Sequence, residues 1–440
     1  MYRKMKLIVI RPFLLLLLLL SQAGAVSEAG AIFLLISPGA RAGGMGEAQV
    51  AVANDAYASY WNPAGLAFLE GTEIAAMHVN WLPNLVSDMY YEFLAFRRHY
   101  PMLGTLGGHI IFLNLGEQMR TDEEGNELGT FTSFMFALSG SYGAHISRNS
   151  SIGLNVKLMY QKLADIPTGA EKGKGVSTDF AFDIGYLKKG FLHPRFDLGL
   201  TLTNVGPKVA FIDEAQADPM PTNFTLGLNY RLVDTEFNKF SLVVDIDKML
   251  VAAYPDMDWD GDGKVGGYDE NGHVSSVNPD YNKKGQKESA HTDPIYLGIF
   301  TSWLDDWLLG GDIDWDGNGK IGGYELDENG DFVPTEDIDW SEDGYGKYNK
   351  DGELEVGTGD DRSFKNELDE LIYNFGIEYW YSKYFALRAG YYWDKTGKIN
   401  NPTFGVGLRF AGYGFDFGFT SGEPGHPLTN TMRFSLNMEF

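Results

Sequence analysis

Two runs of alternating carboxylates carry the clearest chemistry in this sequence. The run at residues 256–268 returns almost unchanged at residues 312–324. Counted from Asp258 and from Asp314, each loop has aspartate or asparagine at positions one, three and five, glycine at position six and a carboxylate at position twelve. Carboxylates this close repel one another unless a cation holds them together. Because calcium accepts six to eight oxygen ligands, including backbone carbonyls, the spacing predicts two calcium-binding loops.

The predicted ligands follow from their positions in each loop. In the first loop they are Asp258, Asp260, Asp262, the carbonyl of Lys264, and Asp269. In the second loop they are Asp314, Asp316, Asn318, the carbonyl of Lys320, and Glu325. Since aspartate is shorter than glutamate, the first loop is expected to bind calcium more weakly, or to accept magnesium.

The segments flanking these loops do not favour the helices of a true EF-hand. Pro255 precedes the first loop, and a pair of glycines interrupts the exit of each loop. EF-hand-like loops without helices suit a structural staple better than a sensor. A third run, from Asp337, has Lys350 where its last ligand should be and is treated as degenerate. The alternative is a solvated acidic loop that binds no metal.

The acidic stretch also explains the charge of the chain. Of the net charge of −25, residues 256–370 contribute −22, from 31 acidic and 9 basic residues. This balance argues against nucleic-acid binding, which needs a basic face. Without cysteine there is no disulfide, thiolate metal site or cysteine nucleophile. The eight histidines are scattered and form no zinc or Ser/His/Asp spacing, so no enzymatic activity is expected.

The N-terminus has the three parts of a signal peptide. Basic residues precede an apolar run at residues 14–20, and Ala23-Gly24-Ala25 fits a cleavage site. The run is shorter than the roughly 20 residues that a spanning helix needs. Residues 1–25 are therefore predicted to be a cleaved signal peptide, with an uncleaved anchor as the alternative.

Beyond residue 70 the sequence alternates with a period of two, which is typical of strands. Residues 152–160, 196–202 and 224–232 each place apolar side chains on one face and Gly, Asn, Thr, Arg or Lys on the other. A soluble sandwich would alternate in the same way. Strand length of about ten residues, strand number and the chain end favour a transmembrane antiparallel β-barrel.

Fourteen strands are predicted, in two groups. Nine lie in residues 71–248 and five in residues 371–440, and the acidic insert at residues 249–370 separates them. The predicted starts are near residues 73, 89, 104, 130, 151, 177, 195, 222, 239, 371, 384, 402, 413 and 431. Segment 294–304 is assigned to a helix because bacterial barrels have even strand numbers.

The last strand indicates that the chain belongs in an outer membrane and which end of the barrel faces the periplasm. Apolar residues alternate from Met432 to Phe440, and this pattern resembles the C-terminal strand of outer-membrane proteins. Counting back from a periplasmic C-terminus, the short connections at 381–384 and 411–414 are periplasmic. The longer connections at 395–401 and 421–430 are then outside the cell, and so is the acidic insert.

The N-terminal segment resembles the PorV/PorQ family, which is itself similar to FadL-type transporters. The resemblance lies in residues 43–47 and in Asp55 followed by Trp61-Asn62-Pro63, and again in residues 373–391 and 429–440. It implies a FadL-like barrel of about 14 strands in which residues 26–70 form a plug inside the lumen. Asp55 is expected to cap a helix over residues 56–60, and Pro63 to force a turn. The calcium insert is not part of the resemblance.

The resemblance also implies a function. Proteins of this type bind exported cargo for the type IX secretion system and pass it to the surface-attachment machinery. The expected partners are therefore outer-membrane lipid, cargo and the secretion machinery, in the bacterial outer membrane. One alternative is a FadL-like channel with a hydrophobic ligand in its lumen. A second is a surface protein stabilised by calcium, with no transport role.

Overall fold

The computed structural model describes residues 29–440 except 87, 122–126, 165–173, 212–216, 255–264, 277–278, 286, 290, 306–321, 328–329, 336–346, 353–354, 356–363 and 423–427. These residues form two compact units. One holds Ala29–Leu250 with Asp369–Phe440, and the other is the insert Val251–Leu368. The predicted signal peptide lies outside the described residues.

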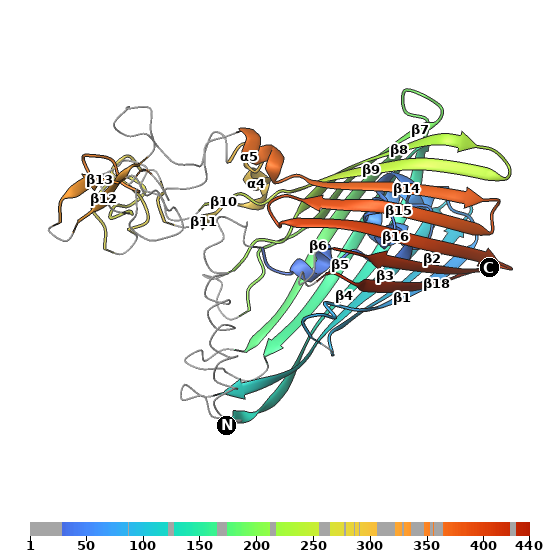
Figure 1. The fold of residues 1–440 in the computed structure, drawn as a ribbon, viewed down its shortest axis with the longest axis horizontal. Coiled ribbons are helices and arrows are strands. Elements are labelled where there is room, and N and C mark those ends of the chain that lie inside the picture. Colours follow the sequence, from blue (N-terminus) through green and yellow to red (C-terminus); the bar gives the residue numbers. More distant parts are fainter. Residues whose placement is uncertain are drawn as a thin grey trace. The chain divides into compact units, whose positions relative to one another are not determined.

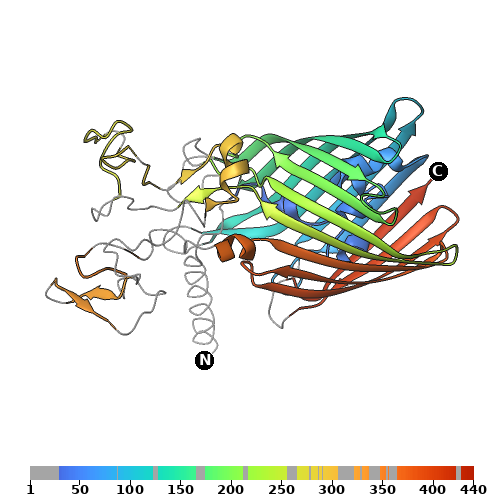
Figure 2. The ribbon, with the colours of Figure 1, turned by 90° about the horizontal axis from the view of Figure 1, so that it is seen from above.

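Fourteen antiparallel strands close into a barrel in the first unit (Figures 1 and 2). They are β1 Thr72–Asn80, β2 Tyr90–Tyr100, β3 Gly104–Thr121, β4 Glu127–Ser147, β5 Ser150–Ala164, β6 Gly175–Lys188, β7 Phe196–Val205, β8 Asn223–Asp234, β9 Asn238–Met249, β14 Ile372–Tyr381, β15 Phe385–Asp394, β16 Ile399–Phe410, β17 Tyr413–Thr420 and β18 Thr431–Glu439. Pairing of β1 with β18 closes the ring, and β9 pairs with β14 across the insert. The predicted all-β fold of fourteen strands is confirmed.

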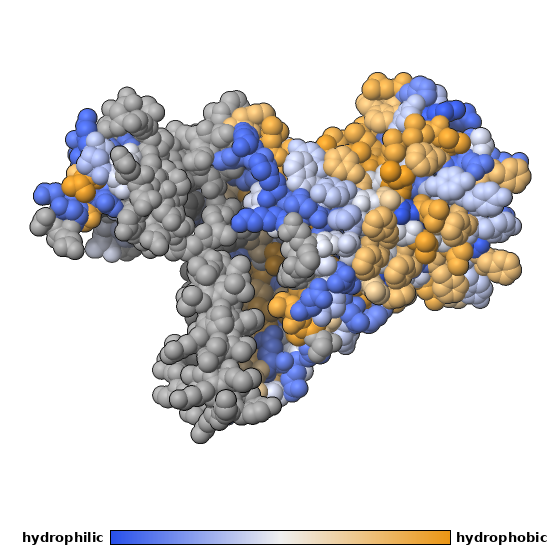
Figure 3. All heavy atoms as spheres, in the orientation of Figure 1, coloured by the Kyte–Doolittle hydropathy of each residue, from blue (hydrophilic) through white to orange (hydrophobic). Residues whose placement is uncertain are grey.

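Alternation along each strand separates a lipid-facing side from an inner side. In β5, Ile152, Leu154, Val156 and Leu158 are exposed, whereas the residues between them are buried. Apolar side chains gather over the surface of the strands in Figure 3. Because every backbone group of a closed ring is paired, such a barrel can place this apolar surface in a bilayer.

The connections differ in length at the two ends of the barrel. Strands β14 and β15 are joined by residues 382–384, and β16 and β17 by residues 411–412. The latter turn places Ala411 and Gly412 at positive φ, 52° and 82°, as a two-residue hairpin turn requires. The longer connections and the insert leave from the opposite end of the strands.

Strands β3 and β4 are longer than a bilayer crossing of about ten residues requires. They hold 18 and 21 residues, and their pairing shifts register between Asn114 and Glu117, where Gly116 has a φ of 79°. The pairing of β3 with β2 ends at Asn114, and that of β4 with β5 ends at Phe134. Among the described residues, the tip of this hairpin is therefore a two-stranded ribbon.

Among its described residues, the insert contains short elements only. It holds the strand pairs β10 Ala253–Tyr254 with β11 His291–Thr292, and β12 Tyr324–Leu326 with β13 Phe332–Pro334, and the helix α4 Ile295–Thr301. A further helix, α5 Phe364–Asp369, leads into β14. Helix α4 confirms the helix predicted over residues 294–304. Within the described ranges, no helix is both long and apolar enough to cross a membrane.

Candidate functional site: the plug in the barrel lumen

Residues 29–70 form a plug of short helices inside the ring of strands (Figure 2). The helices are η2 Ile32–Leu35, α2 Ala40–Gly43, η3 Val50–Val52, α3 Ala58–Trp61 and η4 Pro63–Phe68. Helix α2 contacts β16, β17 and β18, η3 contacts β7, β8 and β9, and η4 contacts β3 to β6. The plug therefore touches the wall on several sides of the lumen, as the resemblance implied.

Glycines in the wall allow the plug backbone to lie directly against the strands. A Cβ added at Gly153 of β5 would lie 2.1 Å from the carbonyl carbon of Pro63. One added at Gly390 of β15 would lie 2.1 Å from the nitrogen of Gly46. Neither position can hold a larger residue unless the backbone of the plug moves.

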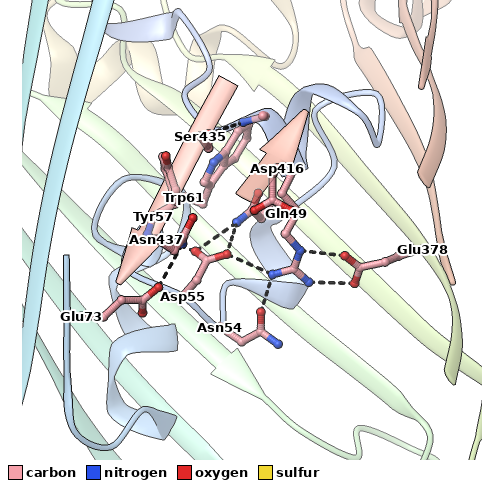
Figure 4. A network of polar contacts seen from close by, with 12 residues as sticks. Gln49, Asn54, Asp55, Tyr57, Trp61, Glu73, Glu378, Asp416, Ser435 and Asn437 are labelled. Carbon is pink, nitrogen blue, oxygen red and sulfur yellow. Dashed lines mark hydrogen bonds and ion pairs between the residues drawn. The ribbon is translucent and has the colours of Figure 1, made fainter. Parts of the chain in front are cut away.

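Arg41 of α2 forms a charged link between the plug and the wall, and Figure 4 shows its two carboxylate partners, Glu378 and Asp55. Its Nε and Nη2 each donate to a different carboxylate oxygen of Glu378 on β14, both at 2.8 Å. Its Nη1 lies 3.1 Å from Oδ2 of Asp55 within the plug. Burial alone would lower the pKa of Arg41, but these two carboxylates raise the pKa well above its usual value. Such a two-pronged pair fixes orientation as well as charge.

Glu378 also belongs to a chain of ion pairs that crosses four neighbouring strands of the wall, β14 to β17. Arg388 Nε on β15 lies 2.8 Å from Glu378 Oε1, and Arg388 Nη1 lies 2.8 Å from Asp416 Oδ1 on β17. Arg409 Nη2 on β16 lies 2.7 Å from Asp416 Oδ2. Buried charges are tolerated only when they are paired in this way. Glu378 therefore has two cationic partners, Arg41 from the plug and Arg388 from the neighbouring strand.

Asp55 caps the turn that leads into helix α3, and the regular helix begins two residues later than predicted. Helix α3 begins at Ala58 and has no side-chain cap. The carboxylate of Asp55 accepts hydrogen bonds from the Tyr57 backbone nitrogen at 3.0 Å and from Arg41. The predicted capping hydrogen bond to the second residue after Asp55 is therefore present, and the same carboxylate also pairs with Arg41.

The other residues of the predicted plug motif connect separate parts of the plug. Trp61 Nε1 donates to the carbonyl of Pro38 at 3.1 Å. Asn62 Nδ2 donates to the carbonyl of Val50 in the plug and to that of Tyr186 on β6, both at 3.1 Å. Asn62 Oδ1 accepts from Ala64, and Pro63 begins η4. These contacts serve the architecture of the plug.

Sequence reasoning missed two further anchors of the plug. Asp245 Oδ2 on β9 accepts from the backbone nitrogens of Gln49 and Val50, at 2.7 and 2.8 Å. Arg433 Nη2 on β18 lies 2.8 Å from Glu47 Oε1. Both side chains belong to the alternating set of residues that faces the lumen. A charged residue in that set was the sign in the sequence that pointed to a contact inside the barrel. Their partners could not be known without the fold.

The inner face of the first strands is largely apolar, unlike the inner face of β5, which carries Ser151, Asn155 and Lys157. In β2, Tyr91, Phe93 and Ala95 are buried. Phe93 stacks on Tyr57 of the plug and on His109 of β3, with ring centroids 5.2 Å apart in each case. The inner face of β1 to β3 is therefore mainly apolar, with Glu73, Arg97, Thr105 and His109 as its polar members, because the plug packs against this side of the lumen.

Among the described residues, a larger and a smaller cavity border the plug. The larger, of about 790 Å³, lies at the end with the short turns and is lined by charges of both signs, among them Arg41, Glu73, Arg97, Arg231 and Arg409. The smaller, of about 170 Å³, lies between the plug and β15 to β18. Its lining includes Ile32, Leu35, Ile36, Trp81, Tyr392, Glu47 and Arg433.

Two of the predicted calcium ligands lie within the described residues. Asp269 Oδ1 accepts from the backbone nitrogens of His273 at 2.9 Å and Asn271 at 3.0 Å, and these hydrogen bonds lower the pKa of Asp269. Glu325 lies in β12 opposite Val333. The other predicted ligands lie outside the described residues, and they are Asp258, Asp260, Asp262, Lys264, Asp314, Asp316, Asn318 and Lys320.

Comparison with solved structures finds transport barrels at low identity. The toluene transporter TbuX of Ralstonia pickettii is 12% identical, with 93% of this chain and 100% of that chain covered and a TM-score of 0.47. The toluene transporter TodX of Pseudomonas putida is 11% identical, with coverage of 92% and 99% and a TM-score of 0.46. A FadL homologue of Pseudomonas aeruginosa is 10% identical, with coverage of 91% and 98% and a TM-score of 0.37.

Comparison with family models gives the assignment. No curated protein matches the chain. The family model described as type IX secretion system protein PorV matches residues 21–256, which is more than half of the chain. That range holds the plug and the first nine strands. This outer-membrane barrel therefore belongs to the PorV family of type IX secretion system proteins.

Proposed function

We propose that this barrel binds exported cargo for type IX secretion and surface attachment, and that its plugged lumen serves as a rigid support. The family match over residues 21–256 is the observation that carries the proposal. The plug adds to it, because Arg41, Asp245 and Arg433 fasten the plug to three separate strands. A lumen filled in this way suits a docking platform better than a wide channel. No catalytic role is proposed.

The tip of the β3–β4 hairpin is the candidate docking face. It exposes Met119 and Leu128, and among the described residues its edges extend beyond the pairing with β2 and β5. An unpaired strand edge can accept an extended segment of another protein through backbone hydrogen bonds. Apolar side chains beside such an edge then select the partner.

The first prediction concerns cargo recovery. Full-length tagged protein, purified from its own outer membrane, should recover exported proteins that share a C-terminal sorting domain. Leu128→Asp should reduce recovery about tenfold, because a charge placed at an apolar contact costs more than about 1 kcal/mol. Quantitative mass spectrometry of the recovered proteins measures this effect.

Leu192→Asp is the matched control, since Leu192 is also exposed but lies in the short β6–β7 connection at the other end of the barrel. It should recover cargo like the unmodified protein. Recovery of no common sorting domain by the unmodified protein would refute docking. Equal recovery by both variants would refute the choice of the hairpin.

A channel for hydrophobic molecules is the second candidate function. The 170 Å³ cavity places Ile32, Leu35 and Trp81 close to Arg433. Arg433 Nε has no hydrogen-bond partner among the described atoms. An apolar molecule with an acid group would suit this lining. Mass spectrometry of organic extracts from the same purified protein tests the channel, which requires a bound compound of that class.

We also propose that the two loops of the insert bind calcium as structural sites. The support is the repeated ligand spacing and the charge of −22 in residues 256–370, which is self-repelling without a cation. Millimolar calcium should therefore slow proteolysis of the insert in the full-length protein. Glu325→Ala should weaken this protection, because it removes the last carboxylate of the second loop.

The exposed Glu270 provides the control for this prediction. Glu270→Ala lowers the charge of the insert by the same amount and should keep the protection by calcium. Cleavage is followed on gels over time, with and without a chelator. If calcium leaves the cleavage rate of the unmodified protein unchanged, the calcium proposal fails.

A further inference from the structure

Each acidic repeat contains a second repeated segment that the calcium motif does not include. The segment is Tyr-Asn-Lys, one residue, Gly, two residues and Glu, and it occupies residues 281–288 and 348–355. In both repeats it returns to the exit of the loop, where Tyr281 bridges to Tyr268 and Tyr348 bridges to Tyr324. The return is kept although the intervening chain is longer in the second repeat.

The returning segment brings a buried glutamate to the same place in both repeats. The backbone nitrogen of Gly266 donates to Glu288 Oε2 at 2.7 Å, and that of Gly322 donates to Glu355 Oε2 at 2.8 Å. Glu288 is 1% exposed and Glu355 0%. In the second repeat Asn349 Nδ2 also donates to Glu355 Oε1, at 3.1 Å.

The glycine that each glutamate contacts holds a defined position in the calcium loop. Counted from Asp258 and from Asp314, Gly266 and Gly322 are both the ninth residue. The ninth residue of a standard loop provides a ligand, often through a water molecule. Glycine has no side chain to do so. Each loop therefore lacks its own ninth-position ligand, and a carboxylate from later in the chain lies beside that position.

We propose that Glu288 and Glu355 supply the ninth-position carboxylate of the two calcium loops, each from the end of its own repeat. This rests on the proposed calcium binding. Each carboxylate accepts a hydrogen bond from the backbone nitrogen of the ninth residue of its loop, which places it beside the position where that ligand is missing. Asp269, the twelfth residue of the first loop, is more exposed and accepts backbone hydrogen bonds in its own turn. Both carboxylates accept backbone hydrogen bonds, so burial is what distinguishes Glu288 from Asp269, and we assign the main ligand role to Glu288.

Substitution by glutamine separates a metal ligand from a purely structural group. Glutamine keeps an oxygen for the glycine nitrogen but removes the charge that calcium needs. A structural role that depends on the contact with the glycine nitrogen would survive Glu288→Gln and Glu355→Gln, whereas a ligand role would not. We expect the double variant to lose about tenfold or more in calcium affinity, because affinity follows the number of charged ligands. Asp269→Asn should have a smaller effect.

The measurement uses full-length protein in detergent and calcium chloride in a calorimetric titration. Terbium provides a second readout, because Trp259 and Trp315 lie within the two loop sequences and can sensitise its luminescence. Glu270→Gln, at an exposed position of the same insert, should bind like the unmodified protein. If the unmodified protein binds neither ion, the calcium proposal itself fails. If it binds both and the double variant binds equally well, only the role of the two glutamates is refuted.

Discussion

Arg41→Ala should destabilise the protein by about 3–5 kcal/mol, the usual cost of removing one partner from a buried ion pair. The substitution leaves the buried carboxylates of Glu378 and Asp55 without the guanidinium that joins them. Arg388 still contacts Glu378, so the wall should keep its own pairing. The destabilisation should therefore affect mainly the binding of the plug to the wall. When samples are heated to increasing temperatures before electrophoresis, the folded band should disappear at a lower temperature.

Two further variants define what Arg41 does. Arg41→Lys should lie between alanine and the unmodified protein, because an ammonium group keeps the charge but cannot form the two-pronged contact. Arg148→Ala, at an exposed turn between β4 and β5, should have little effect. Conductance across planar bilayers should rise for Arg41→Ala only. If Arg41→Ala matches Arg148→Ala in both measurements, Arg41 does not anchor the plug.

Gly153→Ala should destabilise the barrel by about 1–3 kcal/mol, the cost typical of overpacking a close contact. The added methyl group would lie 2.1 Å from the carbonyl carbon of Pro63 and 2.2 Å from the nitrogen of Ala64. Both atoms belong to the plug backbone and cannot rotate away as a side chain can. The plug must therefore shift, which a lower unfolding midpoint and faster proteolysis within residues 29–70 would detect.

Gly140→Ala is the matched control on the neighbouring strand β4. Nothing lies within 4 Å of a Cβ added there, and Gly140 is exposed. Both variants carry the same change in backbone preference, so the difference between them isolates the contact with the plug. Equal midpoints would mean that the plug does not press against Gly153 as described.

The sequence by itself determined the strands and their number. Successive side chains of a strand point to opposite faces, so a wall between lipid and lumen must alternate with a period of two, and this period is visible without any partner. The observed β3, β17 and β18 begin at the predicted residues. The plug was predicted from resemblance alone, since its short helices have no comparable period.

Only the tertiary structure decided which residues hold the plug. Arg41 and Glu378 are 337 residues apart, and their contact exists only once fourteen strands have closed around residues 29–70. The apolar inner face of β2 also depends on the plug, because the plug occupies that part of the lumen in place of water. Glu288 and Glu355 were also absent from the sequence prediction. A calcium loop is recognised from consecutive positions, whereas these glutamates reach the loop exits only through the folding of each repeat.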